Sequence, residues 1–109
     1  MVWIVPEIRS LGELEKIMKA LSNPVRLRIV ASLADEPKHI YALAKELNLS
    51  YPLVHLYLES LEKVGLVEGA PGPAQEDQRE RKYYHTSQFR VNLTPDLIRE
   101  MYKGGKKNG

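Results

Sequence analysis

The sequence predicts a mainly helical α+β fold in a single domain over residues 1–103, and three observations lead to this prediction. Successive segments between residues 8 and 64 place apolar residues at helical spacing. Two alternating segments follow, separated by a charged, proline-rich stretch, and they indicate a β-hairpin. A last periodic segment near the C-terminus predicts a closing helix. A chain of 109 residues accommodates one such domain with a modest core.

The first two predicted helices have recognisable start and stop signals. Apolar residues recur at helical spacing over residues 8–21, with charged residues between them. Asn23 is a suitable cap for a second helix over residues 24–34, because Pro24 needs no backbone donor in the first turn. Pro37 ends this helix, since proline disfavours helical geometry in the residue before it.

The third and fourth helices are joined by a tight turn and form a predicted helix-turn-helix over residues 39–64. Asn48 tolerates the left-handed backbone that such a turn needs. Ser50 caps the fourth helix, and Gly65 lies just past its end. One stripe of this helix is apolar and faces the core. The opposite face carries Pro52, His55, Leu56, Glu59 and Lys63.

A hairpin over residues 66–86 and a closing helix over residues 95–102 complete the domain. Tyr83 and Tyr84 alternate along a strand, so one of them should face the core. Residues 89–93 alternate enough to continue or add a strand. Residues 104–109 are expected to form a flexible basic tail. This order of elements is the winged helix-turn-helix arrangement.

Composition narrows the possible functions. The chain has 16 Lys and Arg against 14 Asp and Glu, so nucleic-acid binding would depend on where the charges lie. The absence of cysteine removes disulfides, thiolate metal sites and cysteine nucleophiles, and it favours a cytoplasmic location. The apolar run at residues 2–5 is too short for a signal peptide or a membrane span. Trp3 in this run should cover a dimer contact or an open edge of the core.

Catalysis is not supported by the sequence. The histidines His39, His55 and His85 fall in separate predicted elements, where each is expected to be a surface or packing residue. No glycine-rich phosphate loop precedes a helix, and no Ser/His/Asp or paired-carboxylate spacing occurs. The sequence therefore predicts a protein that is not an enzyme and has no cofactor and no metal site.

Two segments carry a resemblance to a known family. Residues 18–30, Met-Lys-Ala-Leu-Ser-Asn-Pro-Val-Arg-Leu-Arg-Ile-Val, contain Ala-Leu, then Pro, then Arg-Leu. Residues 49–67 lead from the start of the fourth helix through a leucine to a closing Gly-Leu-Val. Both patterns resemble those of ArsR-type transcriptional regulators, and the resemblance covers residues 14–86.

The resemblance implies a homodimer, built from the first and last helices, that binds successive major grooves of a palindromic promoter operator in double-stranded DNA. Many members of that family leave DNA when they bind a metal or meet an oxidant. The cysteine pair often found on their third helix is absent here, since residues 38–43 offer only His39, and residues 95–102 contain no histidine. The chain therefore resembles a prokaryotic repressor without metal sensing, with no membrane contact and with an unknown small-molecule effector.

The expected DNA contacts begin at the fourth helix. Ser50 and Tyr51 would lie near phosphate, because helix N-termini bind anions through their free amides. The alternative is that Ser50 only caps the helix and Tyr51 packs on the turn. His55 can donate to a base or a phosphate, whereas Pro52 and Leu56 offer apolar contact, for example with thymine methyl groups. The family usually carries arginine where this chain has Leu56, and a leucine at this position weakens base readout.

The hairpin supplies the remaining predicted contacts. Arg79, Arg81 and Lys82 would reach the minor groove or flanking phosphates. The alternative is a solvated loop, because acidic residues at positions 76, 77 and 80 dilute its positive charge. Arg26 and Arg28, near the start of the second helix, would either contact phosphate or pair with Glu13 or Glu15.

A second hypothesis is a winged-helix protein-protein interaction module with little DNA affinity. It is motivated by the weakly basic outward face of the fourth helix, where an exposed leucine can mark a protein contact. The residues that would contact such a partner are Tyr51, Leu56, Glu59 and Glu62.

Overall fold

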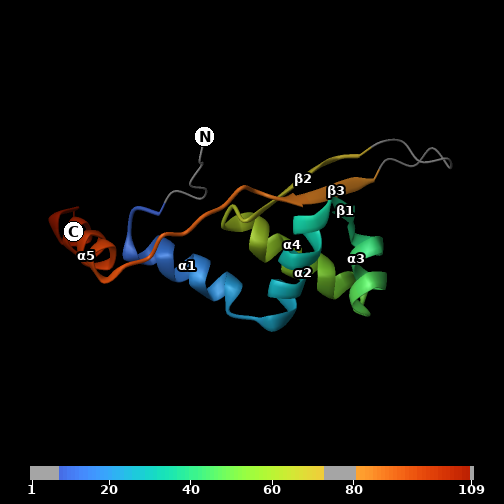
Figure 1. Cartoon of the computed structure of the whole chain (residues 1–109), viewed down its shortest axis with the longest axis horizontal. Helices are drawn as coiled ribbons and strands as arrows, with labels where there is room; N and C mark the ends of the chain where they lie inside the picture. Colours follow the sequence, from blue (N-terminus) through green and yellow to red (C-terminus); the bar gives the residue numbers. More distant parts are fainter. Residues whose placement is uncertain (1–7, 73–80, 109) are drawn as a thin grey trace.

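A three-stranded antiparallel sheet lies against a group of three helices, and two further helices extend to one side (Figure 1). The computed structural model describes residues 8–72 and 81–108. The strand order in the sheet is β1-β3-β2. The elements are α1 (Leu11–Leu21), α2 (Pro24–Asp35), β1 (Lys38–His39), α3 (Ile40–Leu47), α4 (Tyr51–Lys63), β2 (Val67–Pro71), β3 (Lys82–Thr86) and α5 (Pro95–Asn108).

The predicted capping and turn residues take the expected positions. The Asn23 side chain accepts hydrogen bonds from the backbone N–H groups of Val25 and Arg26, at 2.8 and 3.1 Å, and starts α2. Asn48 has a left-handed backbone with φ of 57°, which reverses the chain between α3 and α4. Gly65 has φ of 79° just after α4, where a side chain would strain the backbone.

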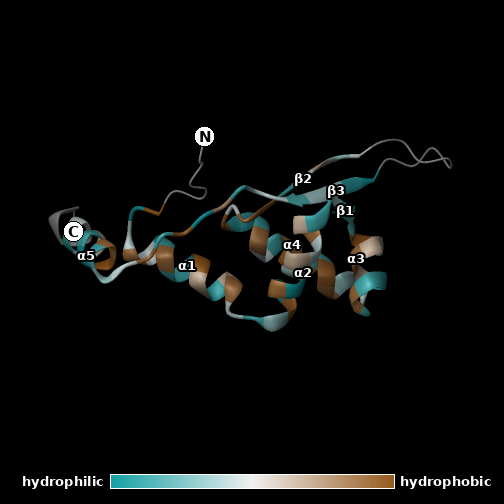
Figure 2. Ribbon diagram, in the orientation of Figure 1, coloured by the Kyte–Doolittle hydropathy of each residue, from teal (hydrophilic) through white to brown (hydrophobic). Residues whose placement is uncertain are grey.

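The core forms where α2, α3 and α4 meet the root of the hairpin, and Figure 2 shows hydrophobic residues concentrated there. Tyr84 is buried and Tyr83 is half-buried, which confirms that one of the pair faces the core. The largest fully buried side chains are Ile29, Leu43, Val54, Leu58, Leu61, Leu66 and Val67.

The hairpin root is anchored behind α4 by Ser87. Its buried hydroxyl donates to the Gly65 carbonyl at 2.6 Å, and its backbone N–H donates to the Leu66 carbonyl at 3.1 Å. In the register of the hairpin, Val67 lies opposite Thr86 and Pro71 opposite Lys82. The base of the hairpin is therefore held directly against the C-terminal end of α4.

The structure differs from the sequence expectations at three places. Lys38 and His39 form the short strand β1, opposite Tyr84 and Tyr83, which the sequence did not predict. Residues 89–93 form no strand, because in the described part of the chain they have no neighbouring strand to pair with. Finally, α5 continues to Asn108, so the expected end at residue 102 and the flexible tail over 104–109 are not observed up to residue 108.

Two leucines on opposite faces of α4 test the packing of this helix. Leu58 is fully buried, whereas Leu56 is 57% exposed. We expect Leu58→Ala to lower the free energy of unfolding by about 2 to 5 kcal/mol, because it leaves a cavity in the core. Leu56→Ala makes the same chemical change on the outer face and should cost no more than about 0.5 kcal/mol. Urea unfolding at one protein concentration measures both, and equal losses would contradict the assigned orientation of α4.

Candidate nucleic-acid interface

The exposed face of α4 brings together five of the predicted site residues. Ser50 is the N-cap, and its hydroxyl accepts a hydrogen bond from the Leu53 N–H at 3.3 Å. Tyr51 is 53% exposed, and Pro52, His55 and Leu56 are exposed over the next turn. Pro52 has no N–H and the Leu53 N–H is used by the cap, so phosphate oxygens can be bound here by the Tyr51 N–H and by the hydroxyls of Ser50 and Tyr51.

His55 has a carboxylate partner on the same helix. Its Nδ1 lies 3.0 Å from Oε1 of Glu59, one turn further along, and both side chains are about half exposed. A carboxylate at this place adds negative charge to the outer face of α4 and repels phosphate. It also orients the ring, so that Nε2 is the nitrogen left to meet a base edge. The outer face of α4 is therefore polar and only weakly basic.

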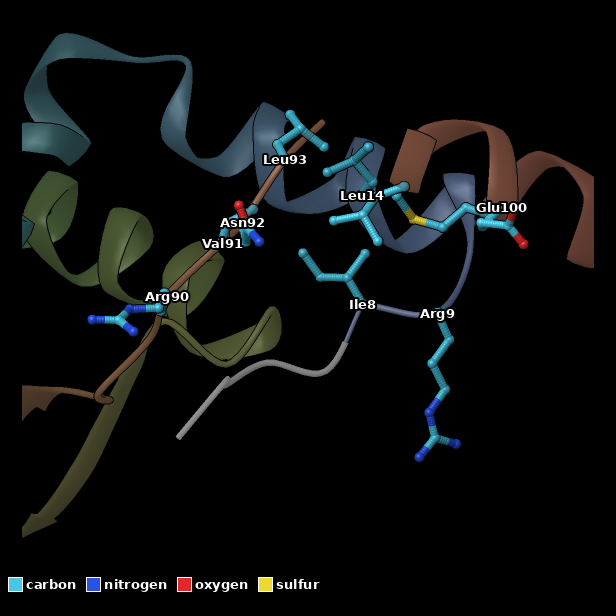
Figure 3. Close-up of a pocket in the computed structure, with 10 residues that line it drawn as sticks. Ile8, Arg9, Leu14, Arg90, Val91, Asn92, Leu93 and Glu100 are labelled. Atoms are coloured by element: carbon cyan, nitrogen blue, oxygen red, sulfur yellow. The ribbon is translucent and has the colours of Figure 1, made fainter. Parts of the chain in front are cut away.

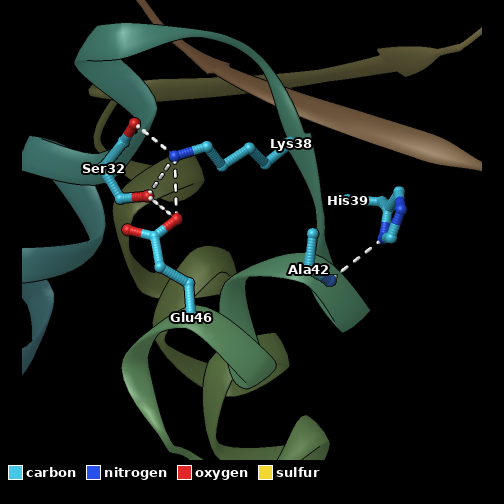
Figure 4. Close-up of polar contacts among 5 residues, drawn as sticks. All are labelled: Ser32, Lys38, His39, Ala42 and Glu46. Atoms are coloured by element: carbon cyan, nitrogen blue, oxygen red, sulfur yellow. Dashed lines mark hydrogen bonds and ion pairs between the residues drawn. The ribbon is translucent and has the colours of Figure 1, made fainter.

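A polar cluster fixes the position of α3 beside α2 (Figure 4). Lys38 donates from Nζ to the Ser32 hydroxyl at 2.7 Å and to Oε1 of Glu46 at 2.8 Å. The Ser32 hydroxyl in turn donates to the same Glu46 oxygen at 2.9 Å. The hydrogen bonds that Glu46 accepts from Lys38 and Ser32 hold the pKa of its carboxyl below the usual value, and the bond from Lys38 has the larger effect. The cluster joins the end of α2, β1 and α3, the first helix of the helix-turn-helix.

His39 joins α3 to the hairpin. Its Nδ1 accepts a hydrogen bond from the Ala42 N–H at 3.1 Å and so caps α3 (Figure 4). Its Nε2 lies 3.1 Å from Nη1 of Arg81. A neutral imidazole has one acceptor nitrogen, so the ring cannot accept from both groups at once. Burial of the ring, and then the charge of Arg81, lower the pKa of His39 below its ordinary value of 6.5.

The predicted hairpin residues occupy different environments. Arg81 is half-buried beside His39, whereas the Lys82 side chain is 54% exposed. The Lys82 ammonium lies 3.9 Å from Oε2 of Glu62 near the end of α4 and 5.1 Å from the ring centre of Tyr84. Arg81 and Lys82, at the end of the described hairpin far from its root, therefore bring positive charge there, and the Lys82 side chain reaches back to α4. Arg79 lies outside the described residues, as does Trp3 at the N-terminus.

The structure gives Arg26 and Arg28 a role that neither sequence alternative included. Arg26 donates from Nε to the Ala20 carbonyl at 2.6 Å and from Nη2 to the Lys19 carbonyl at 3.1 Å, at the end of α1. Arg28 donates from Nη2 to the Leu47 carbonyl at 3.3 Å, at the end of α3. Both arginines thus satisfy backbone carbonyls that a helix end leaves unpaired.

Tyr41 on α3 was missed by the sequence analysis. It is 62% exposed, and its ring lies 6.4 Å from that of His39. A large exposed aromatic residue on the first helix of a helix-turn-helix can contact the DNA backbone. The signal available in the sequence was its place on the polar side of the apolar pattern of α3.

A second surface forms at the far end of the molecule, where α1 and α5 are in contact. A pocket of about 580 Å³ lies between them, and Ile8, Leu14 and Leu93 point toward one another there (Figure 3). The guanidinium groups of Arg9 and Arg90 point away from it. Large apolar side chains on α1, on α5 and in the segment before α5 stay between 37% and 47% exposed. They are Leu11, Met18, Leu93, Leu97, Ile98 and Tyr102.

The described residues form neither a metal-binding cluster nor a membrane-spanning helix. Within residues 8–72 and 81–108, no three His, Asp or Glu side chains are grouped closely enough to hold a metal ion. None of the helices described in these ranges is long and apolar enough to cross a membrane.

The comparisons with known proteins agree on the family that this chain is similar to. The family described as "Bacterial regulatory protein, arsR family" matches residues 23–69, which include α2, α3 and α4. An uncharacterized HTH-type transcriptional regulator of Methanocaldococcus jannaschii is 36% identical over 94 residues, covering 86% of this chain and 97% of the relative.

Solved structures share the fold at lower sequence identity. One is the homodimeric winged helix-turn-helix DNA-binding domain of a possible ArsR-family regulator from Mycobacterium bovis. It is 23% identical with a TM-score of 0.61, covering 90% of this chain and 80% of that chain. Reduced HlyU from Vibrio cholerae is 22% identical with a TM-score of 0.59, covering 88% of each chain. The transcriptional repressor BigR from Xylella fastidiosa is 21% identical with a TM-score of 0.57, covering 89% and 87%. These similarities confirm the predicted winged helix-turn-helix fold.

Acidification should destabilise the fold through His39. Because the folded protein holds the pKa of His39 below 6.5, the unfolded chain binds more protons as the pH falls below that value. The contribution of His39 to stability is therefore present above this pH and decreases below it. His39→Ser keeps a capping hydroxyl without the titrating ring. Between about pH 7.5 and about pH 5.5, the wild type should lose more unfolding free energy in urea than this variant. Equal losses would show that His39 is not responsible.

Proposed function

The chain belongs to the ArsR family of bacterial regulatory proteins, and we propose that it is a homodimeric, cytoplasmic repressor that occupies a palindromic operator. Family membership makes it a DNA-binding helix-turn-helix transcriptional regulator and not an enzyme, as the sequence predicted. The observation that carries the proposal is the start of α4, where Tyr51, Pro52, His55 and Leu56 are exposed above a fully buried apolar stripe. A helix presented in this way fits the major groove.

Each residue of this face has a chemical role in the proposed complex. The cap at Ser50 and the Tyr51 hydroxyl would bind backbone phosphate, which sets the position of the helix without reading sequence. With Nδ1 donating to Glu59, which orients the ring, Nε2 of the neutral imidazole would accept a hydrogen bond from the amino group of a base edge. Pro52 and Leu56 would contact thymine methyl groups. Sequence preference would therefore come from one polar and two apolar residues.

The hairpin would add phosphate contacts beside the groove. Lys82 lies near the exposed face of α4, next to Glu62, and Arg81 lies beside His39. Since His39 can cap α3 with Nδ1 alone, Arg81 can turn to a phosphate while the cap remains. Arg79 would join them from the hairpin tip, as the sequence predicted. These contacts would strengthen binding to any duplex.

Dimerisation would use the surface that α1 and α5 share. The partly exposed apolar side chains of α1, α5 and the segment before α5 are of the kind that a protein interface covers. A second copy related by a two-fold axis would cover them. It would also place the two copies of α4, the recognition helices, on one face of the DNA. The similar Mycobacterium bovis domain is described as homodimeric, and the similar Xylella fastidiosa protein as a repressor. We propose that repression occurs by occupation of promoter DNA and without metal sensing.

Fluorescence anisotropy with the DNA upstream of the gene tests the proposed function. The wild type should bind this duplex more tightly than a scrambled one, with affinity that falls as salt rises. Arg81→Ala/Lys82→Ala should weaken binding to every duplex and flatten the salt dependence by about one unit of slope for each lost contact.

Arg99→Ala/Lys103→Ala is the matched control, because it removes two positive charges from the polar face of α5. This control should bind as the wild type does. An unchanged slope in the hairpin variant would contradict the hairpin assignment. No binding to either duplex at low salt would favour the protein-interaction module instead.

The proposed dimer surface is tested by placing a charge among its exposed apolar side chains. Ile98→Glu should shift the protein from dimer to monomer in analytical ultracentrifugation, because a carboxylate cannot be buried there without a partner. Operator affinity should fall together with the dimer. Arg99→Glu introduces the same residue on the neighbouring polar side of α5 and should remain dimeric. A dimeric Ile98→Glu protein would show that the surface lies elsewhere.

A further inference from the structure

A basic groove lies between α1 and the C-terminal half of α4. Its volume is about 570 Å³, and its polar lining comes from Lys16, Lys19, Arg26, Ser60 and Lys63. Four of these five side chains are cationic, although the whole chain has a net charge of only +2. They come from three different helices, so the fold brings together charges that are scattered in the sequence. This groove is a strong positive feature of an otherwise balanced protein.

The acidic residues near this groove mostly contact basic side chains that lie outside it. Glu59 contacts His55 on the outer face of α4, and Glu62 faces Lys82 on the hairpin. Glu15 lies 3.8 Å from Lys19, but both side chains are about three-quarters exposed, so water weakens this pair. Within residues 8–72 and 81–108, neither Lys16 nor Lys63 makes an ion pair. The groove therefore keeps an excess of positive charge.

Arg26 gives the floor of the groove a fixed guanidinium. Two of its N–H groups are held by the carbonyls of Lys19 and Ala20, and the group lies 5.1 Å from the ring centre of Tyr57. A guanidinium has five N–H donors, so donors remain for an incoming oxygen anion. The flexible ammonium groups of Lys16 and Lys63 at the rim can then adapt to that anion.

The groove continues the face of α4 that would contact DNA. Pro52, Leu56, Glu59 and Lys63 follow the helical spacing of one stripe, and all four are exposed. On its other side the groove is formed by α1, which also contacts α5 at the proposed dimer surface (Figure 1). In the proposed dimer the groove therefore lies between the recognition helix and the two-fold axis.

We infer that this groove binds backbone phosphates of the operator segment between the two half-sites, an inference that rests on the proposed function. Lys16 and Lys63 would neutralise phosphates where the duplex passes from one recognition helix to the other. Such contacts read no base directly, but they favour central sequences whose backbone can approach the protein. The groove would thus make affinity depend on bases that no side chain touches.

The test compares salt dependence for Lys16→Ala/Lys63→Ala and the wild type on the upstream duplex. A dimer lacking these lysines loses four phosphate contacts, so the slope of log K against log salt should become less negative by about 3 to 4. At physiological salt, affinity should fall at least about tenfold. Lys16→Arg/Lys63→Arg should restore both values. Arg99→Ala/Lys103→Ala, with the same change of charge, should match the wild type.

A duplex with neutral methylphosphonates in its centre locates the contact. It should weaken binding of the wild type as much as the double substitution does, and weaken the variant no further. A wild-type slope in the variant, or equal losses of both proteins on the neutralised duplex, would overturn the inference and leave the proposed function standing. A wild type that binds no duplex at low salt would overturn both.

Discussion

The buried apolar stripe of α4 fixes the orientation of this helix in the fold. Val54, Leu58 and Leu61 are fully buried, and their spacing brings them to one side of the helix. Rotating α4 by one residue, about 100°, would carry polar groups into the core and apolar ones out. The stripe therefore decides which side chains face outward. In the proposed complex, the side chains that face DNA would thus be selected by buried residues that do not contact it.

The sheet is attached to both ends of the helix-turn-helix. Before α3, Lys38 and His39 pair with β3, and behind α4 Ser87 bonds the carbonyl of Gly65. The polar cluster of Lys38 with Glu46 adds a third attachment. The hairpin root and α4 consequently keep a fixed spacing, which in the proposed complex would allow the hairpin and α4 to contact one duplex together.

The helices and the outward face of α4 could be predicted from sequence, because caps such as Asn23 and Ser50 and apolar periodicity are local signals. Strand β1 could not, since its two residues become a strand only by meeting Tyr83 and Tyr84 from far along the chain. Residues 89–93 show the converse, an alternating pattern without a partner strand in the described chain. The pairing of His55 with Glu59 was readable from their spacing of four residues.

One side chain has mechanical importance beyond its hydrogen bonds. Arg26 belongs to α2, holds the last carbonyls of α1 and covers the ring of Tyr57 on α4. This one side chain thereby joins three helices, and α1 among them also contacts α5. In the proposed dimer, Arg26 would therefore link the orientation of α4 to the arrangement of the two copies.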